Sequence, residues 1–383
     1  MLFVRTEELR PGMRLAKPIY NKNGVLLYER DSRLTIPAIN SVRNFGLIGI
    51  YILEPAEPVP PFSKEDIEFE QAQTIFTFKL RDIFDKLHKR LLPDKLPALV
   101  EDVLERYGSL SHRVNFNQNL RSADDFMYKH AISTSILAAL ISQHINMPAE
   151  NRQALIAASL LYGFGYRFTP RTILDKTTEL SPTDRDTIQL SLEKGVSYLR
   201  VFYDEFPFLA KALAVVEYYI FSSNPERKYD SPADDILLLA EILRVAQQFD
   251  LLTGMSLGHE PESEIIAMNY LRDNRSVYNE TIVSVLAQCI HIVPAGASVD
   301  LSTKDKAIVL VENPRDYMKP VILRFTDNQI YDLSDPDVYH KIQIVDLMKT
   351  MDNRVEIDEN TLKQFHADAR IVEIANRFRE ALY

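Results

Sequence analysis

Cysteine is nearly absent from the chain, which contains Cys289 alone among its 383 residues. One thiol excludes a disulfide within the chain, and the helical periodicity around Cys289 indicates an ordinary core residue. No apolar run approaches the roughly 20 residues that a membrane-spanning helix needs. Charged residues also interrupt the N-terminus early, at Glu7, Glu8 and Arg10. The sequence therefore predicts a cytoplasmic protein with no membrane span.

An excess of positive charge is also missing. Lysine and arginine number 44 against 54 aspartates and glutamates, which gives a formal net charge of -10. This balance disfavours a nucleic-acid polymer or an anionic membrane as the main partner, although a local basic patch remains compatible with a small phosphorylated ligand. The sequence contains no Walker-type loop, no Cys-x-x-Cys pair and no serine-nucleophile elbow, so these common catalytic and nucleotide-binding motifs are excluded.

Hydrophobic residues make up 46% of the chain and charged residues 26%, as is usual for a globular protein with two or three domains. Helical periodicity dominates the middle, while strand alternation and turns occur at both ends. The pattern predicts a mainly α fold in four parts: a small α+β module (1–56), a linker and helical segment (57–125), a helical domain (126–292) and a small β module ending in an amphipathic helix (293–383, with the helix over 360–382).

Residues 126–166 form the stretch around which the rest is organised. The spacing of apolar residues predicts one helix from near His130 and a second from about Ala149 to Leu161. The second is apolar nearly all round, which indicates a central, buried position. It ends in the sequence YGFGY (162–166), where two glycines permit a sharp exit from the helix.

This layout resembles the HD-GYP family, bacterial phosphodiesterases that hydrolyse cyclic di-GMP at a multi-metal site. In the family, a lone metal-binding histidine opens one helix and a His-Asp-x-Gly-Lys motif closes the next. His130 matches the first element, and Gly165 is the one residue of the second that is retained. The resemblance covers roughly 126–255, and the sequences at both ends of the chain are similar to modules that flank such domains. It implies an HD-GYP-like helical bundle between two small modules.

The family's remaining site residues fall on different side chains here. Its His-Asp pair falls on Tyr162 and Gly163, and the lysine of that motif falls on Tyr166. The next histidine, the adjacent His-His pair and the final aspartate are replaced as well. The positions of the former metal site are therefore His130, Tyr162, Gly163, Tyr166, Ser191, Tyr218, Tyr219 and Gln247.

A metal centre of this type needs several imidazoles and carboxylates, and one histidine does not hold a transition metal alone. The resemblance and these replacements together predict no catalytic residue, no bound metal and no cofactor. His130 is then expected to be a hydrogen-bonded structural histidine. The large tyrosine rings are expected to converge on the former metal position and fill it, with an open pocket that stacks on nucleotide bases as the competing hypothesis.

Three further residues are candidate ligand contacts. Arg227 and Lys228 lie in the segment 220–233, where the family has a glycine-containing Gly-Tyr-Pro loop and this chain has no glycine. They would contact phosphates, or else lie on a solvated loop. Asp250 is a candidate ligand contact next to Gln247, or else a cap or a structural ion-pair partner.

The residues and the resemblance together favour a catalytically inactive HD-GYP-like bacterial signalling protein. We expect it to act as a receptor, scaffold or regulatory partner, with a protein partner or self-association and a cyclic dinucleotide as the candidate small ligand. One alternative is an active metal-dependent phosphodiesterase with atypical ligands. The second is a purely structural interaction protein.

Overall fold

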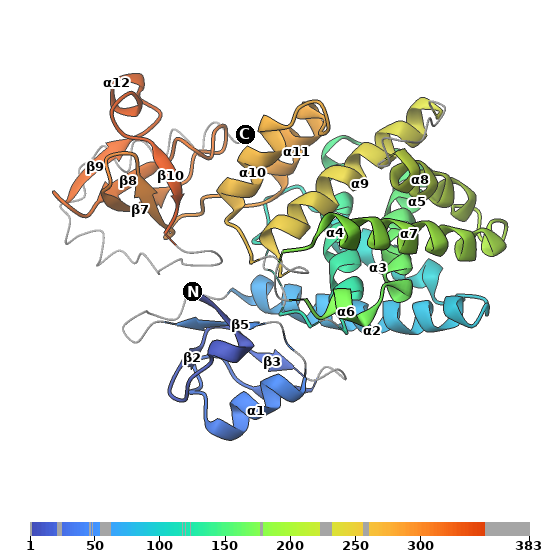
Figure 1. Cartoon of the computed structure of the whole chain (residues 1–383). Coiled ribbons are helices and arrows are strands. Elements are labelled where there is room, and N and C mark those ends of the chain that lie inside the picture. The colour runs from blue at the N-terminus through green and yellow to red at the C-terminus, as the bar shows by residue number, and fades with distance from the viewer. Residues whose placement is uncertain are drawn as a thin grey trace.

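The computed structural model describes residues 2–20, 25–45, 47, 49–53, 63–116, 118, 120–122, 124–176, 179–222, 232–255 and 260–348. The chain is mainly helical, with small sheets near its two ends, as the sequence predicts (Figure 1). The expected helix over 360–382, Arg227 and Lys228 lie outside the described residues. Within the described ranges, no helix has both the length and the apolar character needed to cross a bilayer.

The N-terminal module is a small α+β unit, and its hydrophobic cluster also includes Leu120 and Met255 from the helical part of the chain. Its central strand pairs antiparallel with a strand on either side, and a separate two-stranded hairpin lies nearby. Thr35 caps the helix by accepting from the backbone N–H of Ala38. The elements are β1 (Leu2–Arg5), η1 (Thr6–Glu8), β2 (Arg14–Leu15), β3 (Ile19–Tyr20), β4 (Leu26–Tyr28), α1 (Ile36–Asn44) and β5 (Gly49–Leu53).

The helical part begins at a capping box, in which Ser63 and Asp66 satisfy the first backbone N–H groups of α2. A second capping box, at Ser181 and Asp184, starts α7 in the same way. The elements are α2 (Lys64–His88), α3 (Leu96–Tyr107), α4 (Phe126–His144), α5 (Ala149–Leu161), η2 (Tyr162–Phe168), α6 (Arg171–Leu174), α7 (Pro182–Leu199), η3 (Arg200–Phe202), α8 (Leu209–Ser222), α9 (Asp234–Thr253), α10 (Glu264–Asp273) and α11 (Glu280–Cys289).

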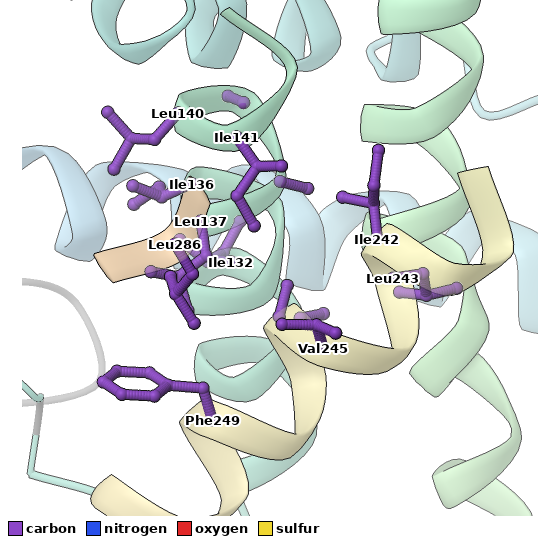
Figure 2. Close-up of a cluster of buried hydrophobic side chains, with 14 of the residues drawn as sticks. Ile132, Ile136, Leu137, Leu140, Ile141, Ile242, Leu243, Val245, Phe249 and Leu286 are labelled. Carbon is purple, nitrogen blue, oxygen red and sulfur yellow. The ribbon is translucent and has the colours of Figure 1, made fainter. Parts of the chain in front are cut away.

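Helix α4 lies at the centre of this bundle and is buried on all sides over most of its length. Its isoleucines and leucines meet side chains from α9 and from α11 (Figure 2). Because a helix that is apolar all round needs neighbours on every face, α4 fixes where the surrounding helices pack. It starts at Phe126, so His130 lies one turn inside the helix rather than at its opening.

The C-terminal module is a five-stranded antiparallel sheet in the order β10-β6-β7-β8-β9. It lies beside α10, and Ser263 at the start of that helix donates a hydrogen bond to Asp346 of β10 (Figure 1). Strand alternation in the sequence predicts strands at 298–301, 307–311 and 321–325, and β6, β7 and β8 lie at these positions. The elements are β6 (Ser298–Leu301), β7 (Lys306–Val311), β8 (Val321–Arg324), β9 (Gln329–Asp332), α12 (Pro336–Tyr339) and β10 (Ile344–Leu347).

Two glycines allow η2 to pack directly on α7. A Cβ atom on Gly165 would lie 2.6 Å from the backbone oxygen of Ser191 and closer still to Leu192. A Cβ atom on Gly195 would lie 2.6 Å from Cα of Gly165. Backbone therefore meets backbone here, and the glycine retained in the YGFGY sequence has a packing role that is independent of metal chemistry.

We expect Gly165→Ala to destabilise the protein by about 1–3 kcal/mol or more, because backbone atoms of α7 have to move away. Gly163→Ala is the matched control in the same 3₁₀ helix. Its added methyl would meet Tyr166 at 3.6 Å and Met127 at 3.8 Å, which is ordinary contact. Urea unfolding of the two variants checks this, and equal stabilities would contradict the close approach.

Candidate functional site

A buried row of hydrogen-bonded side chains crosses the bundle at the start of α4. His130 is fully buried, and its Nδ1 atom lies 2.5 Å from Oδ2 of Asp250 on α9. The other carboxylate oxygen, Oδ1, accepts from Nη2 of Arg121 at 2.6 Å. On the opposite side of the ring, Nε2 of His130 is hydrogen bonded to the hydroxyl of Tyr162. The row therefore runs from Arg121 through Asp250 and His130 to Tyr162.

These contacts determine the protonation states. Burial lowers the pKa of His130, although the hydrogen bond and the charge of Asp250 oppose that shift. Burial alone would raise the pKa of Asp250, but the Arg121 charge and the hydrogen bond from His130 bring it down to about 2. A neutral imidazole satisfies both neighbours, because Nδ1–H donates to the carboxylate while Nε2 accepts from the phenol.

Arg121 is held by further buried groups in the loop before α4 and after α9. Its Nη2 also donates to Oε1 of Gln118 at 2.9 Å, and the amide of Gln118 donates to Thr253 at 2.9 Å. A Cβ atom on Gly254 would come within 2.8 Å of the guanidinium carbon, so glycine leaves the room that the side chain needs. The only buried positive charge of the row is thus enclosed by a matched carboxylate and neutral acceptors.

Three of the four tyrosines converge beside His130. The Tyr162 ring meets His130 and Tyr219 edge-on, at centroid distances of 5.6 and 5.8 Å. Phe126 stacks on the imidazole at 5.4 Å and meets Tyr166 edge-on at 5.6 Å. Burial raises the pKa of Tyr166 to about 12 and that of Tyr162 well above its ordinary value. These rings occupy the position that the resemblance assigns to metal ligands, and their hydroxyls stay protonated.

Two of the other predicted site positions, Ser191 and Gln247, form hydrogen bonds within their own helices. Tyr218 is partly buried against the main hydrophobic cluster. Ser191 donates to the carbonyl of Thr187 in its own helix, at 2.8 Å. Gln247 donates to the carbonyl of Arg244, at 3.4 Å, so its neighbour Asp250 is the α9 residue that meets His130.

Sequence reasoning missed Arg121 and Gln118. Both lie between α3 and α4, in a stretch without helical or strand periodicity, so no pattern marks them. The one sequence signal was the carboxylate of Asp250 on an apolar helix, because a buried carboxylate needs a cation nearby.

The residues present do not fit the metal centre that HD-type sites carry. Among the residues that the structure describes, no three His, Cys, Asp or Glu side chains come together in a group that could hold a metal ion. The donors that remain are already engaged: both ring nitrogens of His130 and both carboxylate oxygens of Asp250 have partners inside the protein. A metal would have to break this row to bind.

Comparison with known families bears on the same part of the chain. Residues 115–282 match the family model of the HD domain, a superfamily whose members are usually metal-dependent phosphohydrolases. The match includes α4, α5, η2, α7, α8 and α9, and so contains Arg121, His130, Tyr162 and Asp250. No curated protein matches the chain. Residues 115–282 of this chain are therefore an HD-superfamily domain.

Proposed function

We propose that this HD domain is a catalytically inactive, HD-GYP-like domain that works as a receptor, scaffold or regulatory partner in bacterial signalling. One observation carries the proposal: His130, the single family ligand that the sequence keeps, is enclosed between Asp250 and Tyr162 and is fully buried. The link to cyclic di-GMP rests on the resemblance over 126–255.

Hydrolysis of a phosphodiester needs a nucleophilic water, a stabiliser of the developing charge and a path for the proton. The side chains of this site supply none of these. Asp250 is a poor proton acceptor because Arg121 and His130 hold its pKa near 2. The phenols of Tyr162 and Tyr166 are poor nucleophiles because burial keeps them protonated. His130 has no free nitrogen with which to bind a metal or a water.

The described helices of the domain nonetheless keep a tightly packed arrangement. The buried helix α4 and the backbone contact between Gly165 and Gly195 both persist without a ligand cluster. A rigid bundle joined to a small sheet module at each end offers extended surfaces for a protein partner or for a second copy of the chain. These features support a scaffold or receptor role over an enzymatic one.

The proposal predicts no turnover of cyclic di-GMP. The full chain, incubated with manganese or ferrous iron, should match both a no-protein blank and His130→Ala by product chromatography, with an active phosphodiesterase as positive control. The double variant Tyr162→His with Gly163→Asp should also stay inactive, because Ser191, Tyr218, Tyr219 and Gln247 still lack ligands. Metal-dependent turnover that disappears in His130→Ala would contradict the proposal.

A further inference from the structure

A cleft of about 650 Å³ lies between the N-terminal module and the helical domain, away from His130. Its volume is within the roughly 300–1,000 Å³ typical of small-molecule sites. One wall comes from the N-terminal module, with Lys17, Phe45 and Leu47, and the other comes from α2 and the start of α4. The residues that matter on this second wall are Phe78, Arg81, Tyr128 and Lys129.

Arg81 is the cation of this cleft that lacks a counter-ion among the described residues. Lys17 donates to the carbonyl of Gln118 at 2.7 Å and lies 3.6 Å from Glu70. Lys129 pairs with Asp125 at 2.7 Å. Of the other lining carboxylates, Asp124 is taken by an ion pair with Arg171. The charges around Arg81 are thus neutralised in pairs, whereas Arg81 itself is not.

The Arg81 guanidinium makes contact with aromatic rings instead. It lies 5.2 Å from the centroid of Tyr128 and 6.0 Å from that of Phe78. Its Nε atom is buried, and no hydrogen-bond acceptor for it exists among the described residues. A buried donor without an acceptor is unfavourable, so Arg81 gains hydrogen bonds if its side chain turns and brings the guanidinium against an anion in the cleft.

Two chemical features therefore meet in one cleft. A guanidinium binds a phosphate group through paired, charge-assisted hydrogen bonds. Next to it, Phe78 is partly exposed and Phe45 is 37% exposed, so flat apolar surface is available for a planar ring. A molecule with a phosphate and a planar base satisfies both features.

We propose that this cleft binds a nucleotide, with its phosphate at Arg81 and its base against Phe78 and Phe45. The site goes beyond the proposed function, because it gives the protein a ligand site separate from the former metal position. Its two walls belong to different modules, so a bound nucleotide also holds the N-terminal module against the helical domain. Through this coupling, the nucleotide concentration controls how the two modules present their surfaces to a partner.

Calorimetry on the full chain tests the proposal with the ribonucleoside 5′-monophosphates, the matching nucleosides and inorganic phosphate as probes. We expect at least one monophosphate to bind saturably with one site per chain, and its nucleoside to bind about tenfold more weakly or worse, since charge-assisted hydrogen bonds are lost. Arg81→Gln should weaken the binding of the monophosphate by a similar factor. Arg106→Gln is the matched control, because Arg106 pairs with Glu68 outside the cleft.

Several outcomes would overturn the proposal: no saturable binding by the wild-type chain at millimolar probe, equal affinity for nucleoside and nucleotide, or unchanged affinity in Arg81→Gln. Binding that survives Arg81→Gln but is lost in Tyr219→Ala would place the nucleotide at the tyrosines instead. The comparison of nucleoside with nucleotide uses the wild-type chain, so it holds even where a variant folds poorly. Each result is independent of the turnover assay, and the two proposals fail separately.

Discussion

Asp250→Asn is expected to lower the free energy of unfolding by roughly 3–5 kcal/mol. The substitution keeps an acceptor for Nδ1–H of His130 but removes the carboxylate that pairs with Arg121, whose side chain is completely buried. An unpaired guanidinium in the protein interior destabilises the fold, because it has lost its hydration without gaining a counter-ion. Urea unfolding followed by circular dichroism measures the difference.

Asp85→Asn is the matched control for this loss of charge. Asp85 also accepts from an arginine, Arg167, at 2.7 Å, but its side chain is 49% exposed. Water can replace the partner there, so we expect a cost below about 1 kcal/mol. In the double variant Arg121→Met with Asp250→Asn, no buried charge is left unpaired, and the cost should be less than the sum of the two single costs. Equal costs for Asp250→Asn and Asp85→Asn would show that the buried pair is unimportant.

Tyr162→Ala should cost about 3–5 kcal/mol, because it removes a buried aromatic ring and leaves a cavity. The ring is 2% exposed and is in edge-on contact with His130 and Tyr219. The variant also leaves Nε2 of His130 without its donor. Thermal and urea unfolding should both show the loss.

Tyr162→Phe separates the ring from the hydroxyl. It keeps the packing and removes the hydrogen bond to His130, so we expect the smaller cost of about 1–3 kcal/mol that follows from an unsatisfied buried group. If the tyrosines instead line an open pocket that stacks on bases, Tyr162→Ala would weaken nucleotide binding and hardly change stability. That pattern would refute the view that the rings are part of the core.

The helices could be predicted from the sequence because their signals are local. The boundaries of α5 follow from a continuous apolar pattern between Pro148 and the YGFGY sequence, and they match the structure at both ends. Strand β9 was not predicted because its residues, Gln329–Asp332, do not alternate between polar and apolar. The sequence analysis placed the start of α4 one turn too late, although Asp125, directly before Phe126, is of a residue type that often caps helices.

The site was predictable only where the family resemblance assigns a position. The resemblance assigned His130, Tyr162, Tyr166 and Tyr219 to one site, and the structure brings these four side chains together. It assigned Gln247 to the former metal site and gave Asp250 only as a candidate ligand contact or a structural residue. Because residues three apart on a helix lie on nearly the same face, only packing decides which of the two reaches His130. Arg81 had no signal at all, since the cleft exists only where two modules meet.

The central claim is that His130 is enclosed by its own protein. Nitrogen-15 NMR of the imidazoles during addition of Zn²⁺ tests it most directly, with the His130 signals assigned by their absence in His130→Ala. Our account predicts that the Nε2 resonance of His130 keeps the position of a neutral, hydrogen-bonded nitrogen throughout. A shift of that resonance that saturates at one equivalent of zinc would contradict the account.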